Sequence, residues 1–365
     1  MRVLQINKLY YPWIGGIETI VKQIAENLDQ TDGFSSTVLA CQARGAKSDE
    51  IINGVRVIKS QSFGRLLGMP ISLSFFKDFK KLAKEPDLIL IHHPFPLAFL
   101  IVPFLKKPFF IFYHSDIVRQ KLSLLPFLPF IRLGLKRARK IFVSGHNLKL
   151  NSSLLAKHRD KVVEIPFGVD INRLKPTLVD YAETEKLKRL DHRPLLLAVG
   201  RLVYYKGYRY LIEAMTDIEA KLIIIGDGPE KANLQKLIND LGVGDKVNII
   251  RAVTDLKPYY LAADIFVFPS CAPSEAFGIV QLEAMSYGKP VVNTYLKTAV
   301  EEVSLNDLTG LTVAPSNSHA LAEAINHLLT NKDERERFGR AAASRVREKF
   351  TEEIFIGKLK KNLTT

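Results

Sequence analysis

The sequence of 365 residues is poor in cysteine and tryptophan, with two of the former and one of the latter. Cys41 and Cys271 cannot form a disulfide framework, so we expect a reducing compartment. Both end apolar runs and are expected to be small core residues. A low-complexity tract is also missing, and the composition is globular, with 47% hydrophobic and 25% charged residues. The length is sufficient for two domains of ordinary size.

An apolar run long enough to cross a bilayer is missing as well. The N-terminal stretch "MRVLQINKLYYPWIGG" lacks the apolar core of a signal peptide. Prolines and a lysine pair interrupt the most apolar region, residues 94–114, before it reaches the roughly 20 residues that a transmembrane helix needs. We therefore expect no transmembrane helix and a cytoplasmic location.

Acidic residues are scarce in the first half of the chain. The whole sequence has 52 Lys and Arg against 38 Asp and Glu, a net charge of +14. Residues 1–180 hold 27 basic against 14 acidic residues, whereas residues 181–365 hold 25 against 24. This asymmetry predicts an anionic partner for the first half: nucleic acid, an acidic membrane or a phosphorylated substrate. A basic surface that only confers solubility is the alternative.

Strand-like and helix-like segments alternate along almost the whole chain. The first half begins with an apolar strand at 2–6 and a helix over 15–28, whose apolar residues recur at helical spacing. A second alternating series follows a polar stretch. Strands are expected at 36–40, 55–60, 87–92, 109–114, 140–144 and 161–166, and then at 195–200, 220–226, 246–251, 264–269, 289–294 and 310–315. This alternation predicts parallel sheets with helices on both faces.

The pause between the two series sets the expected domain limits. We predict an α/β fold of two Rossmann-like, doubly wound domains that face each other across a cleft. The N-terminal domain is expected at 1–169, a linker at 170–193 and the C-terminal domain at 194–345. A C-terminal helix (346–365) is expected to pack back on the first domain. Doubly wound domains bind ligands at the carboxyl ends of their strands, so the cleft between two such edges is the expected site.

Two candidate features lie at strand ends of the first domain. Gly15 and Gly16 join the first strand to the first helix, where backbone can approach a ligand and helix N–H groups can face an anion. A plain tight turn is the alternative. His114 and Asp116 follow a later strand in "FYHSDIV", and a histidine there can hydrogen-bond a sugar hydroxyl or a phosphate without acting as a base. A structural histidine is the alternative.

The second domain repeats the strand–glycine–helix arrangement in "GRLVYYKGYRYLIEAM" (200–215). Arg201 follows the strand and Lys206 precedes a helix, and two fixed cations beside a helix N-terminus suit a diphosphate. A solvated pair of cations is the alternative. The glycine-rich turn in "IIIGDGPEKANL" (223–234) follows the next strand, and here a structural role is favoured.

The most specific stretch is "SEAFGIVQLEAM" (274–285). A helix is expected to begin at its Phe-Gly pair, so that the first amides face the cleft; these belong to Phe277, Gly278, Ile279 and Val280. Glu275 lies just before the helix and is placed to bind sugar hydroxyls. Glu283 lies inside the helix and can accept from ribose hydroxyls if its face lines the cleft. The alternative is an amphipathic helix with two solvated acids.

At these residues the chain resembles the retaining glycosyltransferases of the GT-B fold, in the large group called family 4. The resemblance rests on "IGGIE", "YHSD", "IPFGVDINRLKP", "VGRLVYYKG", "IIIGDGPE", "AADIFVFPS" and "SEAFGIVQLEAM", which follow the family's order over nearly the whole chain. It implies that residues 1–169 form the acceptor-side domain and residues 194–345 the nucleotide-sugar-binding domain.

The resemblance also implies a role for each candidate residue. Arg201 and Lys206 match the pair that holds the donor diphosphate. Glu275 matches the residue at the donor sugar, and Glu283 the residue at the ribose. The residues on the first domain's side of the cleft would be Gly15, Gly16 and His114. The implied catalytic set is Glu275, His114, Lys206 and Arg201.

Glycosyl transfer must stabilise an oxocarbenium-like sugar and a departing diphosphate, and the two cations can neutralise the latter. The sequence contains no Asp-x-Asp metal motif, and the resemblance also implies metal independence, so neither a metal nor another cofactor is expected. For a retaining family we favour front-face attack, in which a donor phosphate oxygen takes the acceptor proton and Glu275 positions the sugar. Double displacement with Glu275 as nucleophile is the alternative.

Within the family, the chain looks most like bacterial surface-polysaccharide mannosyltransferases, which favours GDP-mannose over UDP-hexoses as donor. Two segments depart from the family pattern. "RAVTDLKPYY" (251–260) stands where a Gly-aromatic pair is common and leaves the base pocket open. The segment after "VVNT" carries Lys297, Glu301 and Glu302, which could alter donor or acceptor contacts.

Two basic segments with apolar residues suggest a membrane surface. Residues 68–84 place apolar residues at helical spacing beside four lysines, and residues 119–140 combine Phe and Leu with a basic flank. Core helices with solvated faces are the alternative. With the charge asymmetry, these segments favour a lipid-linked glycan acceptor and a peripheral position on the inner face of the cytoplasmic membrane.

Three rival functions are less well supported. A nucleic-acid-binding protein would carry a recognised module in which aromatic and basic residues alternate, and none is evident. A dehydrogenase needs G-x-G-x-x-G after a strand, and "GDGPEK" lacks the third glycine. A nucleotide-sugar epimerase shares the GT-B shape and stays open until products are analysed without an acceptor.

Overall fold

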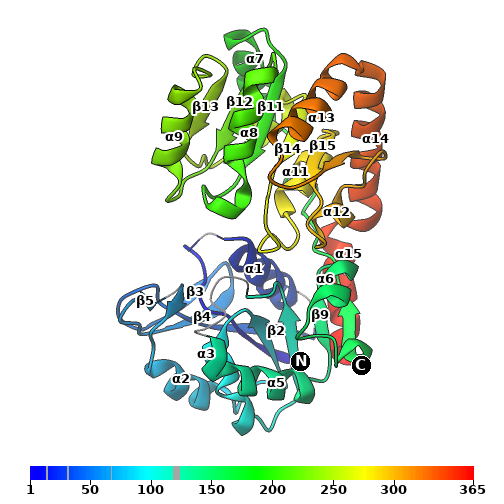
Figure 1. The fold of residues 1–365 in the computed structure, drawn as a ribbon. Helices are drawn as coiled ribbons and strands as arrows, with labels where there is room; N and C mark the ends of the chain where they lie inside the picture. The colour runs from blue at the N-terminus through cyan, green and yellow to red at the C-terminus, as the bar shows by residue number, and fades with distance from the viewer. Residues whose placement is uncertain (14, 31–32, 67, 118–123) are drawn as a thin grey trace. The chain divides into compact units, whose positions relative to one another are not determined.

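The computed structural model describes all residues except 14, 31–32, 67 and 118–123, and the chain divides into two compact units. The first unit comprises Met1–Pro166 and Ile356–Thr365, and the second comprises Phe167–Phe355. In each unit, helices pack around strands that lie side by side (Figure 1). Both units are therefore α/β, as the alternating pattern predicts.

The first unit contains an eight-stranded sheet in the order β10-β9-β8-β7-β1-β2-β4-β3. All neighbouring strands pair in parallel except β3 and β4. The strands are β1 (Arg2–Ile6), β2 (Ser35–Cys41), β3 (Ser48–Ile52), β4 (Val55–Ser60), β7 (Leu88–His93), β8 (Phe109–Tyr113), β9 (Ile141–Val143) and β10 (Val162–Glu164), and a separate hairpin is formed by β5 (Arg65–Leu66) and β6 (Met69–Pro70). The central strands are buried runs of Leu, Ile and Phe, as in sheets covered on both faces.

Helices of the first unit cover this sheet. They are α1 (Gly16–Asp29), α2 (Ser74–Leu82), α3 (Pro96–Phe99), α5 (Leu128–Arg137) and α6 (His146–Asn151). Helix α2 buries its apolar side chains, Phe75, Phe79 and Leu82, in the core of the unit. For the α2 part of residues 68–84, the core-helix alternative is therefore the one that the structure confirms.

The second unit contains a six-stranded, wholly parallel sheet in the order β13-β12-β11-β14-β15-β16. Its strands are β11 (Leu195–Val199), β12 (Lys221–Ile225), β13 (Val247–Ile250), β14 (Ile265–Phe268), β15 (Val291–Thr294) and β16 (Gly310–Val313). Its helices are α7 (Leu178–Leu190), α8 (Tyr208–Ala214), α9 (Lys231–Asp240), α10 (Lys257–Ala262), α11 (Ile279–Ser286), α12 (Val300–Val303), α13 (Ser318–Thr330) and α14 (Lys332–Lys349). Each predicted strand of the second series is present, with ends that differ by one or two residues.

The expected linker is a folded part of the second unit. Residues 178–190 form α7, whose start has a capping box between Thr177 and Asp180. Lys257 of α10 forms an ion pair with Asp180 at 3.0 Å, and the Thr184 hydroxyl donates to the Pro258 carbonyl oxygen at 3.2 Å. Polar composition alone conceals these contacts, which attach the segment to the second unit.

The C-terminal helix α15 (Glu352–Thr364) begins later than the expected residue 346, because α14 continues to Lys349. Its residues from Ile356 onward belong to the first unit. There the Lys140 ammonium donates to the side-chain oxygen of Asn362 at 3.1 Å. Among the described residues, no helix has the length and apolar character needed to cross a membrane.

The two cysteines differ in environment. Cys41 is buried at the end of β2, as expected. Cys271 is only partly buried, so the expectation of a core residue is wrong there. It follows β14 in a loop, where its thiol donates to the Tyr204 carbonyl oxygen at 3.4 Å.

Candidate active site

The sequence-predicted site residues follow the carboxyl ends of parallel strands in both units. In the first unit, β1 leads to the turn at Gly15 and Gly16, and β8 leads to His114. In the second unit, β11 leads to Arg201 and β14 leads to Glu275. Doubly wound sheets bind their ligands at this edge.

Lys206 and Glu275 lie together at this edge of the second sheet. Lys206 ends a 3-10 turn, η4 (Tyr204–Lys206), and Glu275 lies in the loop between β14 and α11. Their side chains form an ion pair and are only 13% and 11% exposed. The Ser270 hydroxyl donates to Glu275 at 3.3 Å, and the Lys206 ammonium lies 4.7 Å from the centre of the Phe268 ring. A cation and a carboxylate are therefore held in place, largely shielded from water.

Arg201 is placed differently from Lys206. Its side chain is exposed, and none of the ion pairs found among the described residues includes it. Lys206 lies across the end of β11, since a Cβ atom on Gly200 would be 3.5 Å from its Nζ. Lys206 thus lies at the end of β11, close to the start of the loop that carries Arg201. Among the described residues, the Lys206 ammonium has a carboxylate partner and the Arg201 guanidinium has none.

Helix α11 begins directly after Gly278, as the Phe-Gly pair predicts. Gly278 has a φ of +77°, and a Cβ atom there would lie 2.6 Å from the Phe268 ring, so only glycine fits. The N–H groups of Ile279 and Val280 are the first of the helix and have no carbonyl partner within it. These groups can receive an anion.

The Phe277 side chain belongs to the core of the second unit. It is 4% exposed, and its ring packs edge-on against Phe167 and Phe350, with ring centres 4.9 and 6.2 Å away. Gln281 donates to the Phe277 carbonyl oxygen at 3.1 Å. Only the amide of Phe277 therefore remains as a candidate ligand-binding group.

Glu283 lies about one turn after the start of α11, and its carboxylate has a hydrogen-bond partner. The Tyr260 hydroxyl, from α10, donates to its carboxylate at 2.7 Å, and the Tyr260 ring stacks on Tyr287 with centres 5.6 Å apart. Burial raises the pKa of Glu283, while the Tyr260 hydrogen bond and the charge of Arg173 oppose this rise. The carboxylate is thus oriented and is not a freely solvated helix acid.

His114 belongs to a buried hydrogen-bond chain in the first unit. The chain runs from Ser36 through Gln5 and His92, with distances of 3.0 Å, 3.0 Å and, between His92 Nδ1 and His114 Nε2, 2.9 Å. All four residues are buried. Burial lowers the pKa of His92 to about 3 and that of His114 well below its usual value, so both rings are neutral near pH 7.

The direction of this chain determines the protonated nitrogen of each ring. Gln5 Nε2 donates to Ser36 Oγ, so its Oε1 faces His92 Nε2 and can only accept. His92 Nε2 therefore carries the proton, and His92 Nδ1 accepts from His114 Nε2. The remaining nitrogen of His114, Nδ1, is then a hydrogen-bond acceptor. A nitrogen that only accepts can bind a sugar hydroxyl but not an ionised phosphate, which has no proton to donate. Of the two ligands that the sequence suggests for His114, the hydroxyl is therefore the one that fits.

The two glycines of the turn in the first unit, Gly15 and Gly16, differ in the space around them. A Cβ atom on Gly15 would lie 2.3 Å from a carboxylate oxygen of Glu18, a buried residue in the first turn of α1. A Cβ atom on Gly16 would have no described atom within 4 Å. Backbone approach by a ligand is therefore open at Gly16, while Glu18 adds negative charge beside Gly15.

One segment that departs from the family pattern lies next to Glu275. The Ala299 amide donates to the Ala276 carbonyl oxygen at 3.0 Å. Lys297 has a φ of +57°, and the Leu296 amide donates to Glu301 at 3.3 Å. Glu301 therefore holds this loop in shape beside the Glu275 loop.

Four further residues belong to the site and were not predicted from the sequence: Gln5, His92, Tyr260 and Ser270. Gln5 and His92 are polar residues within otherwise apolar strands, which is a usable signal for a buried polar network. Nothing in the local pattern of Tyr260 or Ser270 indicates the carboxylates they contact. No described group of three or more His, Cys, Asp or Glu side chains is arranged to hold a metal ion.

Comparison with protein families identifies both units. Residues 14–173 match the model described as "Glycosyltransferase Family 4", and residues 181–345 match "Glycosyl transferases group 1". A solved structure of Anabaena Alr3699/HepE in complex with UDP-glucose aligns with a TM-score of 0.82 at 20% identity, covering 100% of this chain and 99% of that one.

Three curated proteins are similar over nearly their whole length. D-rhamnosyltransferase WbpZ of Pseudomonas aeruginosa is 31% identical over 356 residues, 96% of this chain and 92% of that protein. O-antigen chain mannosyltransferase C of Escherichia coli is 29% identical over 364 residues, covering 98% and 96%. A GDP-mannose-dependent alpha-(1-6)-phosphatidylinositol monomannoside mannosyltransferase of Mycobacterium tuberculosis is 29% identical over 384 residues, covering 98% and 97%.

Proposed function

The chain belongs to the family 4 glycosyltransferases of the GT-B fold, and we propose that it is a retaining, metal-independent hexosyltransferase that acts in cell-surface glycan synthesis, for example of lipopolysaccharide. The observation that carries this proposal is the ion pair of Lys206 and Glu275 beside the first amides of α11. A cation and free amides suit a diphosphate, and an adjacent carboxylate suits sugar hydroxyls.

The proposed donor is GDP-mannose. The names of two similar proteins specify mannosyl transfer, and one of them specifies GDP-mannose. A UDP-hexose is the alternative donor, because the structural neighbour was solved in complex with UDP-glucose. A nucleotide-sugar epimerase of the same fold is the alternative function.

In the proposed reaction the donor's bond from the anomeric carbon to the phosphate oxygen breaks, and the acceptor oxygen bonds to the same face of that carbon. A donor phosphate oxygen takes the acceptor proton. Lys206, Arg201 and the α11 amides neutralise the departing diphosphate where charge develops. Glu275 positions the sugar, and His114 Nδ1 accepts from one of its hydroxyls.

The nucleoside half of the donor is assigned to Glu283, whose carboxylate would accept from the ribose hydroxyls. The Tyr260 hydrogen bond fixes this carboxylate in one orientation before the donor binds. The amides of Gly16 in the first unit and of Phe277, Gly278, Ile279 and Val280 in the second are the proposed backbone contacts, and Gly15 supports the first of them.

A panel of nucleotide sugars tests the proposed donor. Binding of a ligand to the folded state raises the melting temperature by mass action, so GDP-mannose should raise it more than UDP-glucose or UDP-galactose at equal concentration. Incubation of GDP-mannose without acceptor should give no epimer. A larger shift with a uridine nucleotide would overturn the donor assignment, and an epimer would overturn the transferase.

Metal independence has a separate test. Activity should persist in EDTA, because protein cations and amides are proposed to neutralise the diphosphate. Loss of activity in EDTA with rescue by magnesium or manganese would contradict the proposal.

The proposed acceptor is a lipid-linked glycan at an anionic membrane surface. In the first unit, exposed apolar residues gather at the β5–β6 hairpin and the chain before α2, namely Phe63, Leu66, Ile71 and Leu73. Leu73 is 76% exposed, and Lys77, Lys80 and Lys81 of α2 expose their side chains next in sequence. We call these residues the hairpin patch; it replaces the buried face of α2 as the proposed membrane contact.

The second expected membrane segment is assessed only in part. Residues 119–123 lie outside the described residues. In the described part, Leu125 is exposed whereas α5 buries Ile131 and Leu135. The hairpin patch therefore carries the membrane proposal.

Vesicle sedimentation tests the hairpin patch. The double substitution Lys80→Glu and Lys81→Glu should weaken binding to anionic vesicles, since each basic residue near such a surface contributes about 1 kcal/mol. The matched control replaces Lys231 and Lys236 of α9 by Glu and should bind as wild type. Equal binding by both variants, or equal binding to neutral and anionic vesicles, would show that the patch has another role.

A further inference from the structure

A cavity of about 670 Å³ lies at the amino-terminal edge of the second sheet, opposite the edge that carries the proposed donor site. Its lining includes the residues that precede or begin four strands: Leu195, Lys221, Asp264 and Lys289. Lys188 of α7 and Leu261 of α10 complete one wall. The volume falls in the range of small-molecule sites. Neither the comparisons nor the proposed reaction gives this cavity a ligand.

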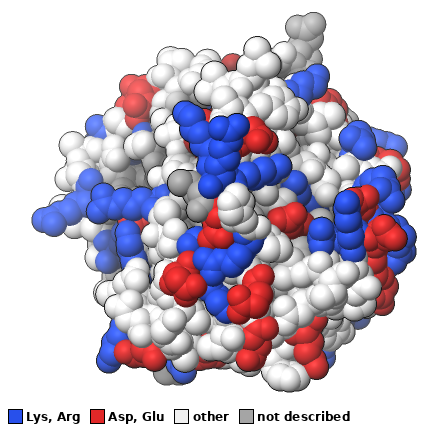
Figure 2. Space-filling view, turned by 90° about the horizontal axis from the view of Figure 1, so that it is seen from above, with Lys and Arg blue, Asp and Glu red and all other residues white. Residues whose placement is uncertain are grey.

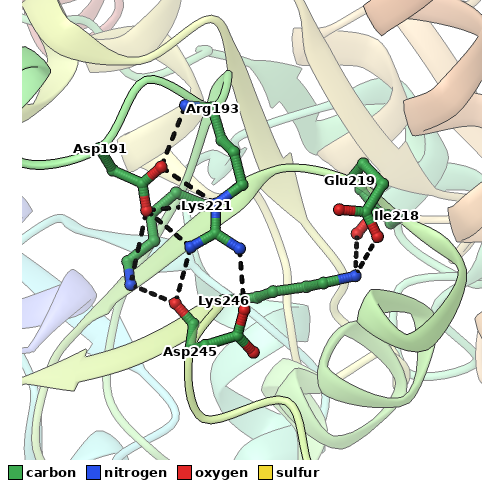
Figure 3. A network of polar contacts seen from close by, with 7 residues as sticks. All are labelled: Asp191, Arg193, Ile218, Glu219, Lys221, Asp245 and Lys246. Atoms are coloured by element: carbon green, nitrogen blue, oxygen red, sulfur yellow. Dashed lines mark hydrogen bonds and ion pairs between the residues drawn. The ribbon is translucent and has the colours of Figure 1, made fainter.

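Asp191, Arg193 and Lys221 of the lining belong to a network of ion pairs and hydrogen bonds (Figure 3). Arg193 donates to the carboxylates of Asp191 and Asp245 at 2.7 and 3.0 Å, and Lys221 donates to the Asp245 carbonyl oxygen at 2.7 Å. The Arg193 hydrogen bonds lower the pKa of Asp191 to about 2. Because these charges already neutralise one another, Arg193 and Lys221 give the cavity shape and little net charge.

Two other lysines add positive charge to the lining. Lys188 and Lys289 both line the cavity, and neither forms an ion pair within 4 Å with any residue that the structure describes. The Lys289 ammonium donates to the Leu261 carbonyl oxygen at 3.0 Å, which fixes its position. Burial lowers the pKa of Lys289 to about 8; the charge of Asp264 opposes this shift, and the charge of Lys188 adds a smaller lowering effect.

The Asp264 carboxylate is already engaged by the backbone. It accepts from the Leu195 amide at 2.8 Å, and the Asp264 amide donates back to the Leu195 carbonyl oxygen at 2.8 Å. Figure 2 looks onto the end of the second unit where α7 and α13 lie in Figure 1, and shows Lys and Arg side chains near the middle and at the edges of this face, mixed with Asp and Glu. The lining has more basic than acidic side chains, namely Lys188, Arg193, Lys221 and Lys289 against Asp191 and Asp264, and this excess of positive charge favours an anion.

We propose that this cavity binds a small phosphorylated molecule, with its phosphate between Lys188 and Lys289. A compact dianion satisfies both ammonium groups at once through charge-assisted hydrogen bonds. Leu187, Leu195 and Leu261 also line the recess and suit an apolar body. The site is separate from the diphosphate site at Lys206 and uses none of its residues.

Leu261 follows Tyr260, the residue that holds Glu283, so the cavity and the proposed ribose site share helix α10. Lys289 likewise lies two residues after Tyr287, which stacks on Tyr260. A phosphorylated ligand at Lys289 would therefore contact the two segments that support Glu283.

Calorimetric titration with inorganic pyrophosphate tests the site. The titrations use protein that carries Lys206→Met, so that the donor site contributes little. Pyrophosphate should bind with one-to-one stoichiometry, and Lys188→Met should weaken this binding about tenfold, the effect of losing one charge-assisted contact. The matched control is Lys186→Met, which removes an exposed lysine of the same helix outside the cavity and should leave the affinity unchanged.

Lys289 needs a test without substitution, because its replacement would leave the Leu261 carbonyl oxygen without a hydrogen-bond donor. Pyrophosphate should protect Lys188 and Lys289 of the wild-type protein from chemical acetylation. Mass spectrometry measures the acetylation of each lysine, and Lys186 serves as the internal reference. Equal affinity of the Lys188→Met and Lys186→Met proteins, no binding at millimolar pyrophosphate, or unprotected lysines would each overturn the proposal. None of these results depends on the donor site, which nucleoside diphosphate binding tests separately.

Discussion

The ammonium group of Lys206 and the carboxylate of Glu275 form an ion pair at the carboxyl edge of the second sheet, with both side chains largely buried. A diphosphate that approaches Lys206 meets this carboxylate beside it. The donor must therefore take the cation while its sugar hydroxyls take the carboxylate, so that the pair is exchanged for two contacts with one ligand. Substitution of either residue leaves the other as an unpaired, largely buried charge.

Lys206→Met should weaken the binding of free nucleoside diphosphate by about 10- to 100-fold. The variant loses a charge-assisted contact worth about 1.5–3 kcal/mol and leaves Glu275 to repel the phosphates. Calorimetric titration measures this effect. Arg209→Met is the matched control, since Arg209 is an exposed cation of α8 that pairs with Glu213. Equal affinity of the two variants would remove Lys206 from the diphosphate site.

Glu275→Gln should act on the rate and not on nucleotide binding. The amide keeps the size of the side chain but loses the charge that positions the sugar, so the rate constant for transfer should fall. Free nucleoside diphosphate should bind as tightly as to wild type or more tightly, because Lys206 no longer shares its charge with a carboxylate. A wild-type rate for this variant, or weaker nucleotide binding at an unchanged rate, would contradict the assignment.

Glu283→Gln should show the opposite pattern. Loss of a charged acceptor for the ribose hydroxyls should weaken the binding of donor and of free nucleoside diphosphate alike, by about tenfold, with little change in the maximal rate. Tyr260→Phe removes the hydrogen bond that orients this carboxylate and should produce a smaller effect in the same direction. Intact nucleotide affinity in Glu283→Gln would return this residue to a structural role.

His92→Phe should lower the transfer rate about five- to tenfold without changing nucleoside diphosphate affinity. An aromatic ring is kept, although a larger one, but His114 Nε2 loses its acceptor and the proton is no longer confined to that nitrogen. Nitrogen-15 shifts of the His114 ring should report a change of tautomer, which a purely structural effect would not produce. An unchanged tautomer with a reduced rate would refute the role of the hydrogen-bond chain.

His93→Phe provides the matched control and a stability prediction of its own. Both ring nitrogens of His93 are buried with no hydrogen-bond partner among the described residues, and the ring stacks on Tyr113 with centres 4.3 Å apart. Phenylalanine keeps the stacking and removes the unsatisfied polar atoms, so the free energy of unfolding should rise by about 1–2 kcal/mol near neutral pH. The transfer rate should stay at the wild-type value.

The same substitution should reduce acid sensitivity. Burial lowers the pKa of His93 to about 3, below its unfolded value of about 6.5, so the unfolded chain binds the extra proton. Stability due to neutral His93 is thus present above pH 6.5 and falls by about 1.4 kcal/mol per pH unit as the pH drops toward 3. Denaturant unfolding between pH 4 and 7 should give a shallower slope for His93→Phe, and parallel slopes would contradict the pKa shift.

The sequence predicts the strands well, because buried parallel strands are apolar runs that any window detects. It also predicts the start of α11, since a Phe-Gly pair that requires φ above zero marks a helix boundary. Strand β3 was not predicted, although Asn53 and Gly54 form the tight turn to β4, with φ of +49° and +88°. Its first three residues, Ser48, Asp49 and Glu50, are polar and give no apolar signal, but the Asn-Gly pair alone indicates a hairpin.

The contacts of the site are the part that the sequence does not reveal. Lys206 and Glu275 could each be named from their motifs, but their pairing depends on the separation of two loops in space. Tyr260 contacts Glu283 only because α10 and α11 lie together, and no periodicity encodes such an arrangement. Gln5 and His92 could have been found as polar residues in apolar strands, whereas the direction of their hydrogen bonds follows only from the positions of four side chains.

Strand β3 also determines how the first sheet ends. It pairs with β4, and its residues Asp49 and Glu50 form ion pairs with Arg56 and Lys59 of β4, both at 2.8 Å. An uncovered β4 would offer unpaired backbone groups to the same strand of another molecule, the usual beginning of edge-to-edge aggregation. The short strand β3 thus ends the sheet with charged side chains at its edge, a feature that disfavours pairing with a strand of another molecule.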